Sequence, residues 1–230
     1  MLMTYGTPKS LNEIEAYYTH IRGGRRPSDA ELENLVERYK AIGGTSPLLS
    51  ITERQVRALQ SLINEKGSDT RVYGAMKHSP PFISEIVEQA EKDGVDRLLC
   101  IALAPHYSNI SIGSYIKAVQ DSNAKLGDPI KLSFIDSWHD HPNLISAWAG
   151  RIRDAQEQLD PNYSLIFSAH SLPERIIGDG DPYKDLLLAT SRLIAKEIVR
   201  DDWSFSFQSA GHTPEPWLGP DILDHLQSVY

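Results

Sequence analysis

The feature that most constrains the fold is a regular alternation of short apolar runs with longer segments of helical spacing. The apolar runs are rich in β-branched and aromatic residues and lie at about 1–5, 71–76, 98–104, 130–137, 163–169 and 203–209. Helical spacing follows near 81–93, 111–125, 142–158 and 182–199. Strands that alternate with helices form parallel sheets with right-handed crossovers and helices on both faces. The sequence therefore predicts an α/β protein.

The connection from the first strand to the second, from about residue 6 to residue 70, is much longer than one crossover needs. It contains three Ser-x-x-Glu patterns, the capping-box signature that satisfies free N–H groups at a helix start: Ser10…Glu13, Ser28…Glu31 and Ser50…Glu53. We expect about three helices here. An excursion of this kind at the carboxyl end of a strand is typical of a binding wall or lid.

A polar, histidine-rich segment, Ser137-Trp138-His139-Asp140-His141-Pro142, interrupts the rhythm. We place a domain boundary there, with a Rossmann-like lobe over 1–138 that carries a helical insertion at about 8–68. A second Rossmann-like lobe is expected over 139–230. His139 and His141 have a spacing that can chelate a metal ion, but histidines on a linker are usually only solvated, and we favour that interpretation.

Composition excludes several classes of protein. Hydrophobic content of 40% and charged content of 23% are ordinary for a globular protein, and no run approaches the ~20 apolar residues of a transmembrane helix. The single cysteine, Cys100, excludes an internal disulfide or cysteine cluster, so we expect the reducing cytoplasm as its compartment. The sequence does not set the oligomeric state, and a monomer is the default expectation. A net charge of −8 argues against nucleic-acid binding and would repel an acidic ligand unless basic residues gather around it.

Four predicted strands are followed by tyrosine or histidine: Tyr5, His78, His106 and His170. Ligands of open parallel sheets bind outside the carboxyl ends of the strands. One such histidine could be an ordinary loop residue with a satisfied hydrogen bond. Four of these side chains at strand ends predict a site in one crevice.

His170 is the strongest candidate, because it follows the buried run 163–167 and lies between small polar residues. Pro173 delays the next helix and keeps the imidazole in an open loop. Imidazole both binds divalent transition metals and exchanges protons near neutral pH. A serine hydrolase with Ser168 or Ser171 as nucleophile is a weaker interpretation, because the Gly-x-Ser-x-Gly elbow is absent.

Basic residues gather in the long connection at Arg22, Arg25 and Arg26, with Arg38 one helix later. Gly23 and Gly24 favour a turn rather than a helix face. Two interpretations stand: a solvated turn, or a clamp in which guanidinium groups bind ligand carboxylates. Tyr39 and the Gly44-Thr45-Ser46-Pro47 turn could add a stacking ring and further donors.

The chain resembles the ferrochelatase family along essentially its whole length. The resemblance is carried by the following segments: Tyr5-Gly6-Thr7-Pro8, Tyr17-Tyr18-Thr19-His20-Ile21-Arg22, Gly43-Gly44-Thr45-Ser46-Pro47, Ala104-Pro105-His106, Ser168-Ala169-His170-Ser171-Leu172-Pro173 and Pro216-Trp217-Leu218-Gly219-Pro220. The first two are similar to the bacterial branch that metallates coproporphyrin III.

The resemblance implies two Rossmann-like lobes with a porphyrin in the cleft between them, and Fe²⁺ insertion that releases two protons. His170 would handle the iron, and Tyr5 would face it from the opposite side of the macrocycle. The positions that hold the porphyrin and its propionates would be Arg22, Arg38, Tyr39, Ser46 and Tyr115. Fe²⁺ is then a substrate and no cofactor is expected, apart from room for Mg²⁺ near the metal site. Transient contact with other enzymes of haem synthesis is also expected.

One part of the family pattern falls beyond Tyr230: the glutamate that partners the histidine, with the last strands of the second lobe. We therefore expect an incomplete second lobe in this stretch, which leaves two alternatives open. One is a porphyrin- or haem-binding protein without turnover. The other is a different type II tetrapyrrole chelatase, against which the long helical connection and the Pro-Trp-Leu-Gly-Pro segment count.

Overall fold

The computed structural model describes residues 1–160, 162–211 and 213–229. The chain forms two compact units, Met1–Ala104 with Ile112–Asp136, and Pro105–Ser111 with Ser137–Tyr230. Among the described residues, no helix has the length and apolarity to cross a membrane.

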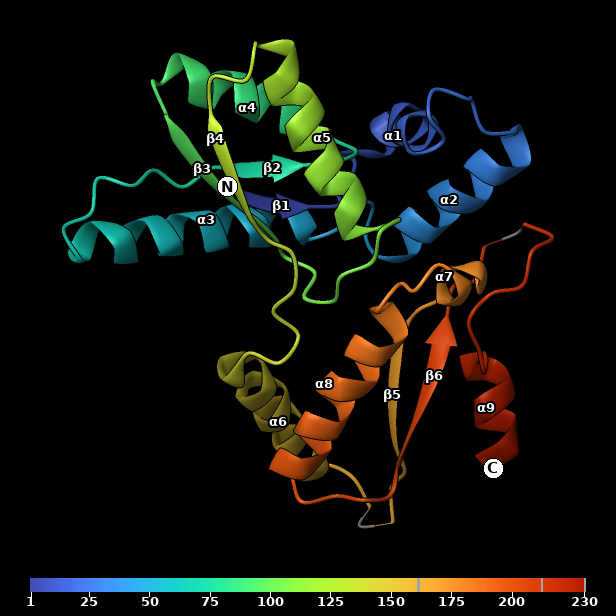
Figure 1. Ribbon diagram of the computed structural model, residues 1–230. Coiled ribbons are helices and arrows are strands. Elements are labelled where there is room, and N and C mark those ends of the chain that lie inside the picture. Colours follow the sequence, from blue (N-terminus) through green and yellow to red (C-terminus); the bar gives the residue numbers. More distant parts are fainter. Residues whose placement is uncertain (161, 212, 230) are drawn as a thin grey trace. The chain divides into compact units, whose positions relative to one another are not determined.

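The elements, labelled in Figure 1, are β1 (Leu2–Thr4), η1 (Leu11–Glu13), α1 (Ile14–Ile21), α2 (Asp29–Ala41), α3 (Leu48–Glu65), β2 (Gly74–Met76), α4 (Ile83–Lys92), β3 (Arg97–Ala102), α5 (Ile112–Lys125), β4 (Lys131–Ile135), α6 (Pro142–Gln156), β5 (Leu165–His170), α7 (Arg175–Gly178), α8 (Tyr183–Glu197), β6 (Trp203–Gln208) and α9 (Ile222–Val229).

The first unit contains a parallel sheet of four strands in the order β2-β1-β3-β4. Along β3, Leu98, Cys100 and Ala102 are buried while Arg97 and Leu99 are exposed, the period of two expected of a strand with unequal faces. Figure 1 shows α4 and α5 on one side of the sheet and α3 on the other. The parallel α/β architecture predicted from the alternation of elements is confirmed.

The second unit is built on the parallel pair β5 and β6, in register from Leu165↔Trp203 to His170↔Gln208. Helices α6 and α8 pack together, and α9 packs against β6 (Figure 1). Because side chains alternate along a strand, one face of the pair presents aromatic rings to a hydrophobic cluster beneath α7 and α8. The buried members of this cluster are Ile176, Leu187, Phe207 and Leu218.

Only one of the three expected capping boxes forms. Ser28 Oγ accepts from Glu31 N at 3.3 Å, and the Glu31 carboxylate accepts from Ser28 N at 2.7 Å. Ser10 precedes the short η1 without a side-chain cap. Ser50 lies inside α3 and donates to Pro47 O at 3.0 Å, because proline, with its fixed φ, starts this helix earlier. The predictions for Ser10 and Ser50 were therefore wrong.

The histidine-rich segment serves to begin α6. His141 Nδ1 accepts from Asn143 N at 3.2 Å, and Pro142 occupies the first helical turn. His139 Nδ1 shares a hydrogen bond of 2.9 Å with Ser137 Oγ, and its side chain is only 18% exposed. The two rings thus have separate local partners, and His139 is more covered than the solvated linker we expected.

Candidate functional site

The ends of β1 and β2 deliver Tyr5 and His78 side by side. Their ring centroids lie 4.5 Å apart, and His78 N donates to Tyr5 O at 2.9 Å. Gly6 then turns the chain with a φ of +100°, and Thr7 N donates to Ser79 Oγ at 3.0 Å. Tyr5 remains 45% exposed, whereas His78 is buried. The tyrosine ring is therefore accessible to solvent, and the buried histidine packs against it.

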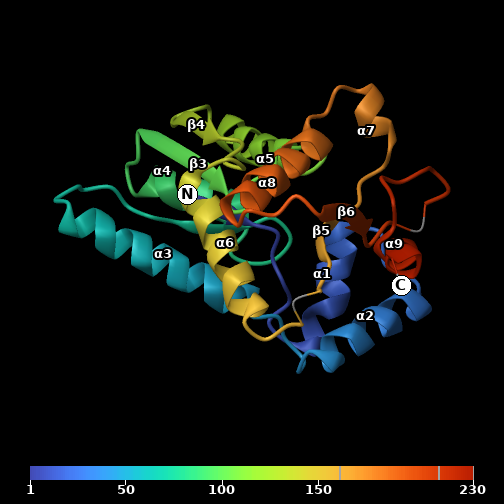
Figure 2. The same cartoon turned by 90° about the horizontal axis from the view of Figure 1, so that it is seen from below.

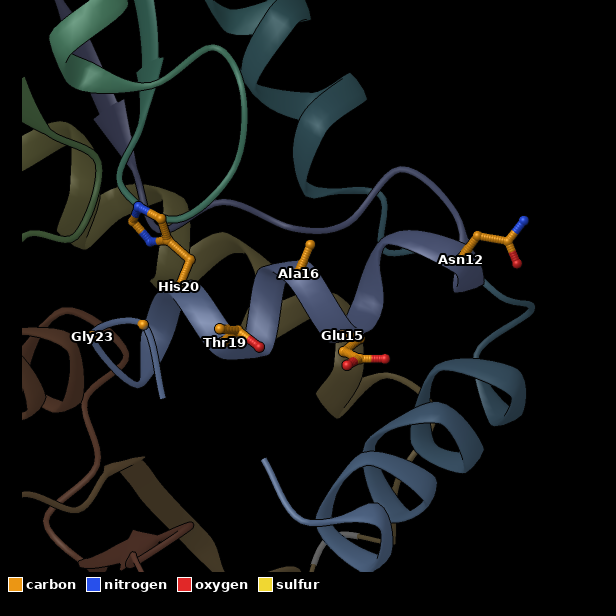
Figure 3. A pocket seen from close by; sticks show the side chains of 7 residues that line it. Asn12, Glu15, Ala16, Thr19, His20 and Gly23 are labelled. Carbon is orange, nitrogen blue, oxygen red and sulfur yellow. The ribbon is translucent and has the colours of Figure 1, made fainter. Parts of the chain in front are cut away.

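His20, at the end of α1, is a partner of this pair that the sequence reasoning did not single out. The Nδ1 atoms of His20 and His78 lie 3.0 Å apart, and His20 stacks on Phe82 at 5.0 Å. Figure 3 shows His20 projecting from the last turn of α1, along a shallow pocket that Glu15 and Thr19 also line. The spacing of Tyr17 and His20 on one side of a predicted helix was the available signal.

Burial, with Lys77 and His20 nearby, lowers the pKa of His78 to about 4. An unfolded histidine titrates near 6.5, so the unfolded chain binds more protons between these values and stability falls as pH falls through this window. We expect the free energy of unfolding to decrease from pH 7 to pH 4.5, and His78→Gln to flatten this dependence. Urea unfolding at several pH values measures the slope, and an unchanged slope in the variant contradicts the assignment.

Phenol groups from three helices surround the β1 end. The Tyr39 hydroxyl shares a hydrogen bond of 3.1 Å with Thr7 Oγ1, and the Tyr17 hydroxyl donates to Gly6 O at 3.1 Å. Lys77 Nζ donates to Ser114 Oγ at 2.5 Å and lies 5.2 Å from the centre of the Tyr115 ring. Burial raises the pKa of Tyr5, of Tyr17 and of Tyr115, so these phenols, protonated at neutral pH in any case, also stay protonated in mildly alkaline solution.

The arginine cluster is largely paired within the chain, which changes the clamp interpretation. Arg22 Nη1 lies 2.5 Å from Glu31 Oε1, and Arg26 pairs with both Glu15 and Asp29. Gly23 and Gly24 take positive φ values after α1, so the predicted turn is confirmed. Arg22 Nε is buried and has no hydrogen-bond partner in the described part of the chain.

Arg38 and Ser46, two further residues predicted to contact the porphyrin, lie on either side of the turn between α2 and α3. Arg38 is exposed in the last turn of α2. Ser46 Oγ accepts from Leu48 N at 3.2 Å and so helps to begin α3. Unlike Arg22, Arg38 has no carboxylate within salt-bridge distance among the described residues. It is the better placed of the two to receive an acidic ligand without first breaking a pair.

His170 is the last residue of β5, paired with Gln208, and is exposed, so it lies at the strand end and not in the open loop that we expected. The loop that follows it is held by the Pro-Trp-Leu-Gly-Pro segment. Ser171 N donates to Gln208 O at 2.7 Å, and its buried hydroxyl donates to Leu218 O at 2.8 Å. Leu218 N in turn donates to Leu172 O at 2.9 Å. The His170 segment and the Pro-Trp-Leu-Gly-Pro segment, joined by a contact between residues 47 apart in the chain, are therefore hydrogen-bonded to each other. A buried Ser171 committed to a carbonyl also removes it as the nucleophile of a hydrolase.

The α7 helix begins only at Arg175, so the expected delay by Pro173 is confirmed. Desolvation lowers the pKa of His170, which favours the neutral imidazole that can bind a metal ion or accept a proton. His106 follows β3 of the first unit but belongs to the second unit, where its Nε2 lies 2.9 Å from Thr190 Oγ1. Burial lowers its pKa to about 4. We interpret His106 as a structural residue.

Comparison with known proteins gives a consistent result. The Ferrochelatase family model matches residues 1–230. The chain is 43% identical to Coproporphyrin III ferrochelatase 2 of Bacillus cereus, covering all of this chain and 73% of that protein. It is 44% identical to Coproporphyrin III ferrochelatase of Halalkalibacterium halodurans, covering 75% of it, and 43% identical to Ferrochelatase of Herpetosiphon aurantiacus, covering 77%.

These alignments extend over the whole chain and therefore span both the Tyr5 and the His170 segments. With the family match over residues 1–230 and the parallel α/β units described above, they lead to one conclusion: the chain belongs to the ferrochelatase family.

Proposed function

We propose that this protein inserts Fe²⁺ into coproporphyrin III, with release of two protons, as a step of haem synthesis. The observation that carries the proposal is His170, an exposed imidazole with a lowered pKa at a braced strand end, in a chain 43% and 44% identical to two coproporphyrin III ferrochelatases. A chelatase must bind iron and release it again. One histidine with open coordination positions suits that task better than a closed four-ligand site.

On the iron side, neutral His170 has two uses. Its lone pair can bind the incoming ferrous ion, and it can accept a proton that leaves a pyrrole nitrogen. Iron binding and proton acceptance can occur one after the other, because the ion leaves the imidazole when it enters the macrocycle. In the family pattern a carboxylate is the partner of this histidine. We do not propose Glu174 for that role.

On the porphyrin side, the aromatic and basic residues of the first unit match a flat acidic ligand. Tyr5, the ring proposed to face the metal, is exposed and backed by His78. Tyr39 and Ser46 contribute hydroxyl groups on either side of the turn that follows α2. The Tyr115 ring is only 6% exposed and lies beside Lys77. Coproporphyrin has four carboxylates, so it needs more cationic partners than a porphyrin with two. Arg38 and Arg22 supply them in a chain whose net charge is −8.

The proposal includes no resident cofactor, because Fe²⁺ is consumed as substrate; Mg²⁺ near the metal site is the accessory ion it allows. We further propose a monomer in the cytoplasm that meets other haem-synthesis enzymes transiently. The buried free thiol of Cys100 is consistent with a reducing compartment.

The experiment is anaerobic incubation of the protein with Fe²⁺ and coproporphyrin III, followed by absorbance. Loss of the free-porphyrin bands with formation of the metalloporphyrin spectrum supports the enzyme. Tight porphyrin binding without metallation contradicts it and favours a carrier without turnover. Protoporphyrin and Co²⁺ in parallel reactions test the preference for coproporphyrin and for iron.

The Arg22–Glu31 pair gives a test of the clamp. Glu31→Gln removes the competing charge but keeps an oxygen acceptor for Ser28 N, so the helix cap survives. If Arg22 binds a propionate, this variant should bind coproporphyrin about threefold more tightly, in line with the modest strength of an exposed ion pair. Fluorescence quenching of the porphyrin measures the affinity.

Glu37→Gln is the matched control, because Glu37 lies on the same helix and pairs with Lys40 at 2.8 Å. It changes net charge equally and should leave the affinity nearly unchanged. Equal tightening in both variants would mean that overall charge, not release of Arg22, is responsible.

A further inference from the structure

The main-chain carbonyl of His170 is held by a side chain outside the sheet. Strand β6 ends at Gln208, and Ser209 turns away with a φ of +60°. The sheet therefore does not continue past this residue pair. Instead, the Tyr183 hydroxyl donates to His170 O at 3.0 Å. Because Ser171 N donates to Gln208 O at 2.7 Å, both the C=O and the N–H of the peptide group that joins His170 to Ser171 have fixed partners.

Tyr183 is the first residue of α8 and is itself fixed by Asp181. Tyr183 N donates to Asp181 Oδ1 at 3.0 Å, so this carboxylate, just before the N-cap Pro182, accepts the first free N–H of a helix of 15 residues. The ring of Tyr183 also packs against the hydrophobic cluster that contains Phe207 and Leu218. Its hydroxyl therefore approaches the His170 carbonyl from an anchored ring.

Asp181 is a buried charge without a cationic partner in the described part of the chain. It is only 6% exposed, and its Oδ2 accepts from Ser108 Oγ at 2.9 Å and from Asn109 N at 2.7 Å. A buried carboxylate is costly unless donors surround it. Here three donors and the positive end of the α8 dipole stabilise it. The carboxylate thus joins the 105–111 loop to the start of α8.

We propose that Tyr183 and Asp181 are positioning residues for iron handling: Asp181 fixes the start of α8, and the Tyr183 hydroxyl then sets the peptide that carries the His170 imidazole. The inference rests on the proposed function of His170. The Tyr183 hydroxyl acts through the His170 peptide: it keeps the imidazole in one orientation, so that the ferrous ion meets a preformed ligand.

The decisive variant is Tyr183→Phe, which keeps the ring in the cluster and removes only the hydroxyl. We expect the KM for Fe²⁺ to rise about tenfold, the usual scale for loss of an outer-shell hydrogen bond at a metal ligand. The KM for coproporphyrin III should stay within about twofold, because the porphyrin contacts are on other elements. Asp181→Asn should shift the Fe²⁺ KM in the same direction.

Tyr163→Phe is the matched control. Tyr163 lies before the opposite end of β5, where its hydroxyl bonds to Gln156 and its ring stacks under Arg200. It should lose similar stability without a change in either KM. If Tyr183→Phe leaves the Fe²⁺ KM unchanged, or raises both KM values equally, the positioning role is wrong.

Hydrogen–deuterium exchange of the 168–174 segment provides a readout that does not need turnover. Tyr183→Phe should speed exchange at the Ser171 amide, while Tyr163→Phe should not. If the unmodified protein metallates no porphyrin, the proposed function fails, yet the exchange result still decides whether the hydroxyl orders this loop. Unchanged exchange in Tyr183→Phe would overturn the inference.

Discussion

His170→Ala is expected to lower the rate of coproporphyrin metallation by at least about 100-fold, the lower range for removal of a group that transfers protons in the rate-limiting step. The imidazole ends β5 and is exposed, so its removal leaves no core cavity and breaks no side-chain hydrogen bond to a residue that the structure describes. Porphyrin affinity should change less than about threefold. Stopped-flow absorbance under anaerobic conditions measures the rate, and fluorescence quenching measures the affinity.

His225→Ala is the control for loss of a histidine in the same unit. His225 lies on α9, where its Nε2 is 2.8 Å from Ser204 Oγ. This variant should retain the rate within about twofold. A protein that metallates at full speed without His170 would remove this residue from the mechanism, whatever the family resemblance implies.

Gly6→Ala is expected to cost about 3 kcal/mol of unfolding free energy, because two penalties add. The residue has a φ of +100°, which alanine rarely adopts. Its Cβ would also lie 2.6 Å from Ser79 Oγ and 2.9 Å from Ser79 N, distances that require the backbone to move. The same movement would displace Tyr5, so porphyrin binding should weaken as well.

Gly24→Ala separates the two penalties. Gly24 has a φ of +90°, but no atom lies within 4 Å of a Cβ placed there. It should lose only about 1 kcal/mol, the cost of the backbone conformation alone. Chemical denaturation followed by circular dichroism compares the two, and equal losses would show that the contact with Ser79 relaxes without cost.

The two units also differ in how their sites could be inferred. Tyr5 and His78 follow neighbouring parallel strands, and strand ends of a parallel sheet meet at one edge, so their contact could be expected from the order of elements. His106 follows a strand in the same way, but its ring is bound to Thr190 on α8. The side chain of a residue just past a strand end can hydrogen-bond to any element that packs there. The order of elements in the sequence does not reveal which element that is.

The amino-acid sequence by itself determined the order of strands and helices, their parallel arrangement and the residues at the strand ends. These follow from periodicity and from proline and glycine, which act on the local backbone. Only the tertiary structure decided the pairing of Arg22 with Glu31, the contact of His20 with His78 across 58 residues, and the support of His170 by Tyr183. Such contacts depend on strand register and on which helix faces which loop, and the chemistry at each residue depends in turn on those neighbours.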